Sequence, residues 1–225
     1  MSNELKKRIT TSALLILIVL SCLFINNFLW LFLLATAALI CWVEFINLNK
    51  KIWKSKYSTI LTALLSFSYL YFFTYSVYKT KIYAGEIVIL FYLLVCVFSD
   101  IGGYIVGKKI GGKKLTKISP KKTISGSIGS FLFSLFPIVI YITLSSVTNN
   151  NSFNRTFEDQ DYEVIFVCLI LSLMCQIGDL VISYFKRLAK VKDIGKILPG
   201  HGGMLDRIDG IIFALPFIFI INYII

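Results

Sequence analysis

The chain has 225 residues, of which 57% are hydrophobic and only 16% are charged, and its formal net charge is +11. A soluble domain has about a quarter of its residues charged, so a water-exposed fold cannot bury this much apolar surface. The single histidine excludes zinc sites built on several His ligands. The five cysteines form no Cys-x-x-Cys pair, which favours small buried residues over disulfides or metal ligands.

Apolar runs predict an all-α, polytopic membrane protein with about seven membrane helices, each needing about 20 residues. The first run, residues 9–43, contains no charged residue and is long enough for two short helices. Asn26 and Asn27 are the natural tip of the hairpin between them. The further spans are predicted at residues 58–78, 87–106, 127–147, 164–185 and 211–225.

We expect one integral membrane domain over residues 1–225, because no Pro- or Ser-rich linker and no internal repeat divides the chain. Residues 1–98 would form the N-terminal helices. Residues 99–225 would form the half that carries chemistry, with polar loops at residues 107–125 and 187–209.

Basic residues fall almost entirely on one face of this predicted topology. If the N-terminus is cytoplasmic, all 23 Lys and Arg lie on the inner face except Lys79, Lys81 and Arg155. The positive-inside rule therefore supports this orientation and places both polar loops in the cytoplasm. The lack of a long N-terminal targeting region favours a bacterial inner (plasma) membrane.

Three carboxylates interrupt the apolar runs, and each costs about 2.5 to 3.5 kcal/mol near the bilayer centre unless it is paired or used. Glu44 precedes Lys50 and Lys51, which predicts snorkelling or a plain interfacial ion pair. Asp100 and Asp179 precede the next basic residue by eight and seven residues, respectively. This spacing puts both about 10 Å inside the same face, where they can share a cavity.

Asp179 belongs to a polar stripe on its predicted helix. Gln176, Asp179, Ser183 and Lys186 follow one another at helical spacing, so they lie along one side. Such a stripe cannot face lipid. A buried structural network between helices and a functional site are both open readings of it.

The loop at residues 107–125 is dense in glycine and lysine. It runs from Gly107 to Lys114 and continues through Ser119-Pro-Lys-Lys-Thr123. Its composition suits phosphate binding, and the alternative is attraction of the lysines to anionic lipid headgroups, at about 1 kcal/mol each.

The segment at residues 183–209 carries the highest density of functional side chains. Gly200, Gly202 and Gly203 allow a ligand to approach the backbone closely. Asp206 and Asp209 present two oxygen ligands on one side of a helical turn, and hard carboxylate oxygens suit Mg²⁺. A magnesium-bound triphosphate surrounded by Lys and Arg is the predicted ligand.

This segment resembles the signature of the phosphatidate cytidylyltransferase (CDP-diacylglycerol synthase) family. The matching residues are Ser183-x-x-Lys186-Arg187, Lys192-Asp193, Pro199-Gly-His-Gly-Gly203 and Asp206-Arg207-x-Asp209. Ser119 to Thr123 with Gly126, and Gln176-x-Gly178-Asp179, also resemble family motifs, so the resemblance covers roughly the C-terminal half.

The resemblance implies a nucleotidyltransferase of phospholipid biosynthesis that converts CTP and phosphatidate to CDP-diacylglycerol and pyrophosphate with Mg²⁺; a second cation stays open. We expect Asp179 and Asp206, helped by Asp209, to hold the metal, and the Asp206→Asn variant to lose turnover without unfolding. His201 would either donate to a phosphate oxygen or fix the glycine loop. The expected catalytic residues are Asp179, Lys186, Arg187, Asp193, His201, Asp206, Arg207 and Asp209, and the expected substrate-binding residues are Ser119, Lys121, Lys122, Thr123, Gln176, Ser183, Lys192, Gly202 and Gly203.

Two other functions stay open on the sequence. A CTP-dependent polyprenol or phytol kinase could use similar groups but would transfer the γ phosphate. An anion or proton transporter could line a path with Asp100 and Asp179, although no inverted repeat supports it. Membrane lipids are expected partners, nucleic acid is not, and a homodimer stays open.

Overall fold

The structure is a computed structural model that describes residues 3–148, 161–195, 197–198 and 202–223. Within these ranges the regular elements are helices, and strand pairing is limited to two isolated bridges. Five of the described helices are long and apolar enough to cross a membrane. The chain is therefore an all-α polytopic membrane protein, as the sequence predicts.

The first two helices form the predicted hairpin. Helix α1 (Asn3–Ile25) and helix α2 (Asn27–Ile52) pack together and are separated at Asn26. The Asn26 side chain caps α2 by accepting the backbone N–H of Phe28 at 2.9 Å. An asparagine N-cap satisfies a helix-end donor that an apolar residue would leave unpaired, which explains why the long apolar run breaks here.

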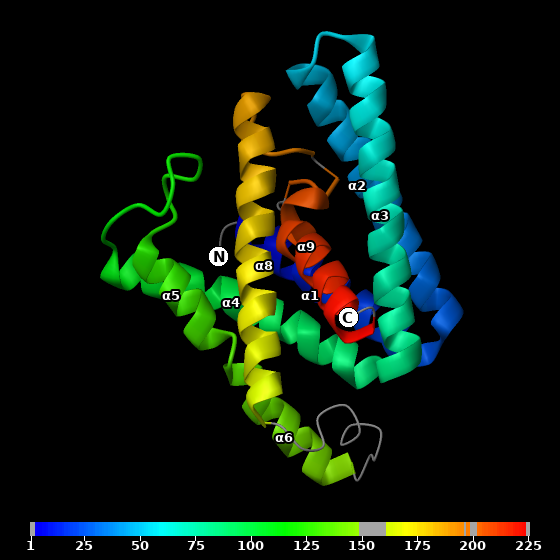
Figure 1. Cartoon of the computed structure of the whole chain (residues 1–225), viewed down its shortest axis with the longest axis vertical. Coiled ribbons are helices and arrows are strands. Elements are labelled where there is room, and N and C mark those ends of the chain that lie inside the picture. Colours follow the sequence, from blue (N-terminus) through cyan, green and yellow to red (C-terminus); the bar gives the residue numbers. More distant parts are fainter. Residues whose placement is uncertain (1–2, 149–160, 196, 199–201, 224–225) are drawn as a thin grey trace. The chain divides into compact units, whose positions relative to one another are not determined.

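Helix α3 (Lys56–Ala84) returns alongside α2, and Figure 1 shows the two helices running side by side after a short turn. The indole N–H of Trp42 donates to the carbonyl of Ala63 at 2.9 Å, and the Trp42 ring meets Phe67 edge-on. The buried face of α2 repeats every three or four residues, at Trp30, Leu34, Ala38, Cys41, Glu44 and Leu48. Glu44 thus belongs to a face that is otherwise largely apolar.

Helix α4 (Glu86–Ile110) packs closely against helix α5 (Ile124–Phe133), and both are drawn in green in Figure 1. Glycines make this approach possible. A methyl group on Gly129 would lie 2.5 Å from Val106 Cβ and 2.8 Å from the Gly102 carbonyl oxygen, and one on Gly126 would lie 2.9 Å from the Gly103 carbonyl oxygen. Small residues let helix backbones meet in this way in membrane proteins.

The single span predicted at residues 127–147 is wrong, because the structure divides it into α5 and helix α6 (Phe136–Thr148). Pro137 explains the break. In a continuous helix its missing N–H would leave the Phe133 carbonyl without a donor, and its ring would clash with that carbonyl. Helix α5 ends at Phe133, four residues before the proline.

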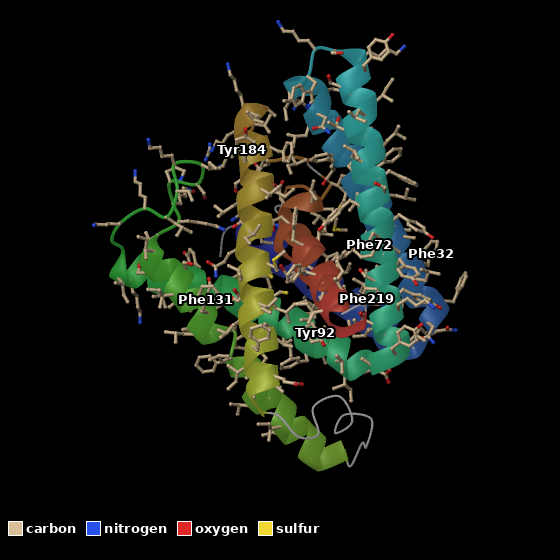
Figure 2. The ribbon with its side chains drawn as sticks, in the orientation of Figure 1. Phe32, Phe72, Tyr92, Phe131, Tyr184 and Phe219 are labelled. Carbon is tan, nitrogen blue, oxygen red and sulfur yellow. The ribbon has the colours of Figure 1, made fainter. Side chains whose placement is uncertain are left out.

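Helix α8 (Asp161–Leu188) contains the span predicted at residues 164–185. Helix α9 (Leu205–Tyr223) begins six residues before the predicted start at 211, so its first turn includes Asp206. Figure 2 shows Tyr92 on α4 and Phe219 on α9, and both side chains are buried.

The chain forms two compact units, each built from two chain segments. Unit 1 comprises residues 1–78 and 184–209, and unit 2 comprises residues 79–183 and 210–225. Each unit therefore joins early helices to part of the C-terminal region. The prediction of one domain over residues 1–225 stays a prediction.

Candidate active site

In unit 2, the carboxylate of Asp179 in α8 is paired with a lysine from the loop between α4 and α5. Asp179 Oδ2 lies 2.6 Å from Lys122 Nζ, and Ser183 donates its hydroxyl to Asp179 Oδ1 at 3.1 Å. The side chains of Lys122 and Asp179 are 25% and 34% exposed, so a ligand can still reach them. Asp100 of α4 interacts electrostatically with both groups. The Lys122–Asp179 ion pair therefore lies within electrostatic range of a second carboxylate.

Backbone hydrogen bonds fold the loop into a hairpin that presents Lys122. Leu115 N donates to Lys122 O at 2.8 Å, and Lys122 N donates to Ser119 O at 3.0 Å. The next residue, Thr123, caps α5 by accepting the N–H of Gly126 at 3.1 Å. Lys122 thus lies at the N-terminal end of α5, where the helix dipole favours a negative charge.

Gln176 belongs to a hydrogen-bonded network among α4, α5 and α8. Ser127 of α5 donates to Gln176 Oε1, and Gln176 Nε2 donates to Ser172 Oγ at 3.4 Å. Ser172 in turn shares a 2.8 Å hydrogen bond with Ser99 of α4, and both serines are fully buried. The polar stripe therefore has two parts. Gln176 belongs to a structural network between helices, whereas the ion pair with Lys122 and the partial exposure of Asp179 favour a functional role for Asp179.

In unit 1, Asp206 organises the loop between α8 and α9. Its Oδ1 accepts from Lys186 Nζ at 2.9 Å, while its Oδ2 accepts the backbone N–H of Ile194 at 2.8 Å and of Gly203 at 3.2 Å. The side chains of Lys186 and Asp206 are 18% and 7% exposed. One buried carboxylate therefore fastens both ends of the loop and neutralises a lysine.

Two backbone hydrogen bonds between Leu198 and Gly202, at 2.9 and 3.2 Å, close the loop towards its tip. Gly202 has a φ of 90°, a left-handed conformation that favours glycine. Asp193 lies next to Gly202. His201 lies outside the described residues, so both roles predicted for it stay predictions.

The remaining predicted site residues are close to these two pairs in the sequence. Ser119 and Asp209 are half-buried, and the others are exposed: Lys121, Arg187, Lys192, Asp193 and Arg207. Their catalytic or binding roles stay predictions.

Glu44 has contacts that differ from those predicted from the sequence. It is only 4% exposed, and it accepts the backbone N–H of Met204 on Oε1 at 3.1 Å and of Leu205 on Oε2 at 2.8 Å. The predicted snorkelling or pairing with Lys50 or Lys51 is therefore corrected. The carboxylate satisfies two donors at the start of α9 that have no partner within that helix.

Comparison with known proteins places this architecture in a family. A family model described as "Cytidylyltransferase family" matches residues 51–225. The chain belongs to this cytidylyltransferase family. The resemblance seen in the motifs of residues 183–209 is thereby confirmed. The matched region includes Lys122, Asp179, Lys186 and Asp206, but Glu44 precedes it.

Curated bacterial proteins named phosphatidate cytidylyltransferase are similar to this chain. The Rickettsia bellii protein is 43% identical over 135 residues, which cover 60% of this chain and 57% of the relative. The proteins of Staphylococcus saprophyticus and Staphylococcus aureus are 44% and 47% identical over 130 and 129 residues, covering 57% of this chain and 46% of each relative. The chain thus spans about half the length of the curated relatives it matches.

Mg²⁺ prefers hard oxygen donors, and the carboxylates of this chain differ in how far their oxygens are already engaged. Among the described residues, no three His, Cys, Asp or Glu side chains gather as a metal cluster. Asp206 already accepts three hydrogen bonds on its two oxygens. Asp179 has one ammonium and one hydroxyl partner and lies near Asp100, so this pair of hard oxygen donors fits Mg²⁺ better. The metal-binding roles of Asp206 and Asp209 stay predictions.

Proposed function

We propose that this chain transfers the cytidylyl group of CTP to phosphatidate, forming CDP-diacylglycerol and releasing pyrophosphate. The observation that carries the proposal is the Lys122–Asp179 pair at the N-terminal end of α5, in a member of the cytidylyltransferase family. The printed names of the relatives specify phosphatidate as the acceptor of those proteins, and the proposal extends that acceptor to this chain.

The proposed reaction needs positioning more than acid–base chemistry. The second pKa of a phosphate monoester is about 6, so phosphatidate is already largely dianionic at neutral pH. One of its phosphate oxygens forms a bond to the α phosphorus of CTP. The bond from that phosphorus to the bridging oxygen breaks, and pyrophosphate leaves with the electron pair. A site therefore accelerates this step by aligning the two phosphates and balancing their charge.

The described residues supply groups for both tasks. Lys122 would bind phosphate oxygens, and the positive end of the α5 dipole would favour their negative charge. Asp100 and Asp179 would hold a Mg²⁺ ion, which neutralises triphosphate charge when bound. In unit 1, taken by itself, the loop held by Asp206 has glycines at Gly202 and Gly203, where a nucleotide would be able to approach the backbone.

We propose that this chemistry takes place at the cytoplasmic face of a bacterial inner membrane. The positive-inside distribution of Lys and Arg supports that orientation. Phosphatidate would enter sideways from the inner leaflet with its acyl chains in lipid. This arrangement explains why the lysine–carboxylate pairs lie near the ends of membrane helices.

The test uses purified protein in detergent with phosphatidate, Mg²⁺ and CTP labelled at either the α or the γ phosphate. We expect α label in the lipid fraction and none after chelation with EDTA or in the Asp179→Asn variant. The variant Glu163→Gln, which changes an exposed carboxylate at the other end of α8, is the matched control and should keep full activity. Appearance of γ label in lipid would make the protein a lipid kinase, and absence of label from lipid with folded protein would reject both enzymes.

A further inference from the structure

The carboxylate of Glu44 connects a helix near the N-terminus to the loop that precedes α9. It lies on α2, and its two acceptor contacts reach Met204 and Leu205, 160 and 161 residues later in the chain. Both partners belong to unit 1. The neighbouring N–H, that of Gly203, donates to Asp206. Three successive backbone N–H groups are therefore held by two buried carboxylates.

Glycines on both sides of the loop surround the Glu44 carboxylate. A methyl group on Gly203 would lie 2.8 Å from each carboxylate oxygen. A methyl group on Gly195 would overlap Glu44 Oε1 and lie 2.9 Å from its Cδ. The loop thus folds tightly around the carboxylate, and the fit requires the absence of side chains at both positions.

An apolar residue would fill this position on α2 at lower cost, because a carboxylate in a membrane helix is expensive unless it is used. The use visible here is to fix the backbone at Gly195 and at residues 203–205. A carboxylate does this well, since it accepts two N–H groups at once and complements the dipole at the start of α9.

We propose that Glu44 is a positioning residue that holds the backbone at residues 202–205 in the conformation that binds the nucleotide. This inference rests on the proposed cytidylyl transfer and assigns a role in it to the helices that precede the family match at residue 51. Glu44 does not touch the reacting atoms in this proposal. It acts through the backbone of Met204 and Leu205.

The first test compares Glu44→Gln with Glu86→Gln, the same substitution at an exposed residue in the first turn of α4. The glutamine keeps one acceptor but turns an NH₂ group towards the other backbone N–H. We expect kcat/KM for CTP to fall about ten- to a hundredfold, with a higher KM for CTP and an unchanged KM for phosphatidate. Glu86→Gln should behave as wild type. A lower kcat with an unchanged KM for CTP would reduce Glu44 to a purely structural role and overturn the proposal.

The second test approaches the same contact from the loop. When Glu44 is present, Gly195→Ala pushes a methyl group against its carboxylate and should raise the KM for CTP. In a Glu44→Ala background, Gly195→Ala should change that KM by less than twofold. Equal effects in both backgrounds would contradict the contact.

Hydrogen exchange at the Met204 and Leu205 amides separates this inference from the proposed function. Faster exchange in Glu44→Gln than in Glu86→Gln supports the loop-holding contact even if the wild type makes no CDP-diacylglycerol, in which case only the proposed reaction fails. Unchanged exchange overturns the role of Glu44 whatever the activity.

Discussion

The Lys186–Asp206 pair can be tested by a double-mutant cycle of Lys186→Met, Asp206→Asn and the combined variant. The two groups are 2.9 Å apart and only 18% and 7% exposed, so solvent screens them weakly. In Asp206→Asn, the one remaining side-chain oxygen can accept either from the lysine or from the two backbone N–H groups. The NH₂ group then faces the remaining donors, which lose their acceptor. We therefore expect each single variant to lose about 2 to 4 kcal/mol of unfolding free energy, with a coupling of about 1 to 3 kcal/mol between them.

Unfolding by SDS in mixed micelles, followed by circular dichroism, measures these free energies, and Glu163→Gln again serves as the exposed control. Losses of this size leave a protein of ordinary stability folded. Asp206→Asn should then still lack turnover, because its loop is no longer held. The reasoning is refuted if the single effects add to within about 0.5 kcal/mol, since independent sites behave in that way.

Three further outcomes follow from unit 2. Lys122→Met should lower incorporation of α label from CTP about a hundredfold, because a charge-assisted contact to phosphate is lost, whereas Lys117→Met at an exposed loop position should not. Thr123→Val should cost about 1 kcal/mol of unfolding free energy through loss of the α5 cap, and Thr123→Ser should cost little. Gly129→Ala should lower the unfolding free energy by about 1 to 3 kcal/mol, because the added methyl group meets Val106. An unchanged unfolding free energy would show that α4 and α5 can move apart to accept the methyl group at no cost.

The helical architecture was predictable because a lipid environment leaves few options for the backbone. An uncharged run must form helices that satisfy their own hydrogen bonds, and Asn26 marked where one such run turned. The break between α5 and α6 could also have been predicted from the sequence. Pro137 lies in the middle of the predicted span, and the rule that proline ends a helix four residues earlier would have found it.

The two lysine–carboxylate pairs were only half predictable. Motifs identified Lys122, Asp179, Lys186 and Asp206 as site residues, but no local rule specifies which loop lysine pairs with which helix carboxylate. That choice depends on how the hairpin at the start of α5 folds and on where the chain re-enters the membrane. Both depend on contacts between residues far apart in the sequence.

Glu44 shows which argument from the sequence was too simple. Lys50 and Lys51 follow it by six and seven residues, and neither is at the spacing of three or four that brings side chains together on a helix. A direct ion pair was therefore improbable on geometry alone. The actual partners are backbone groups, which leave no signature in side-chain chemistry.

The distance along the chain between Glu44 and Leu205 also has a consequence for biosynthesis. The ribosome must add 161 residues after Glu44 before its partner exists. At about 5 to 20 residues per second, that interval lasts roughly 8 to 32 seconds. During this time the Glu44 carboxyl group lacks these two backbone partners, so insertion of α2 into the membrane depends on the apolar remainder of its sequence. Once the start of α9 is made, the same carboxylate gains its two backbone partners and stabilises the folded protein.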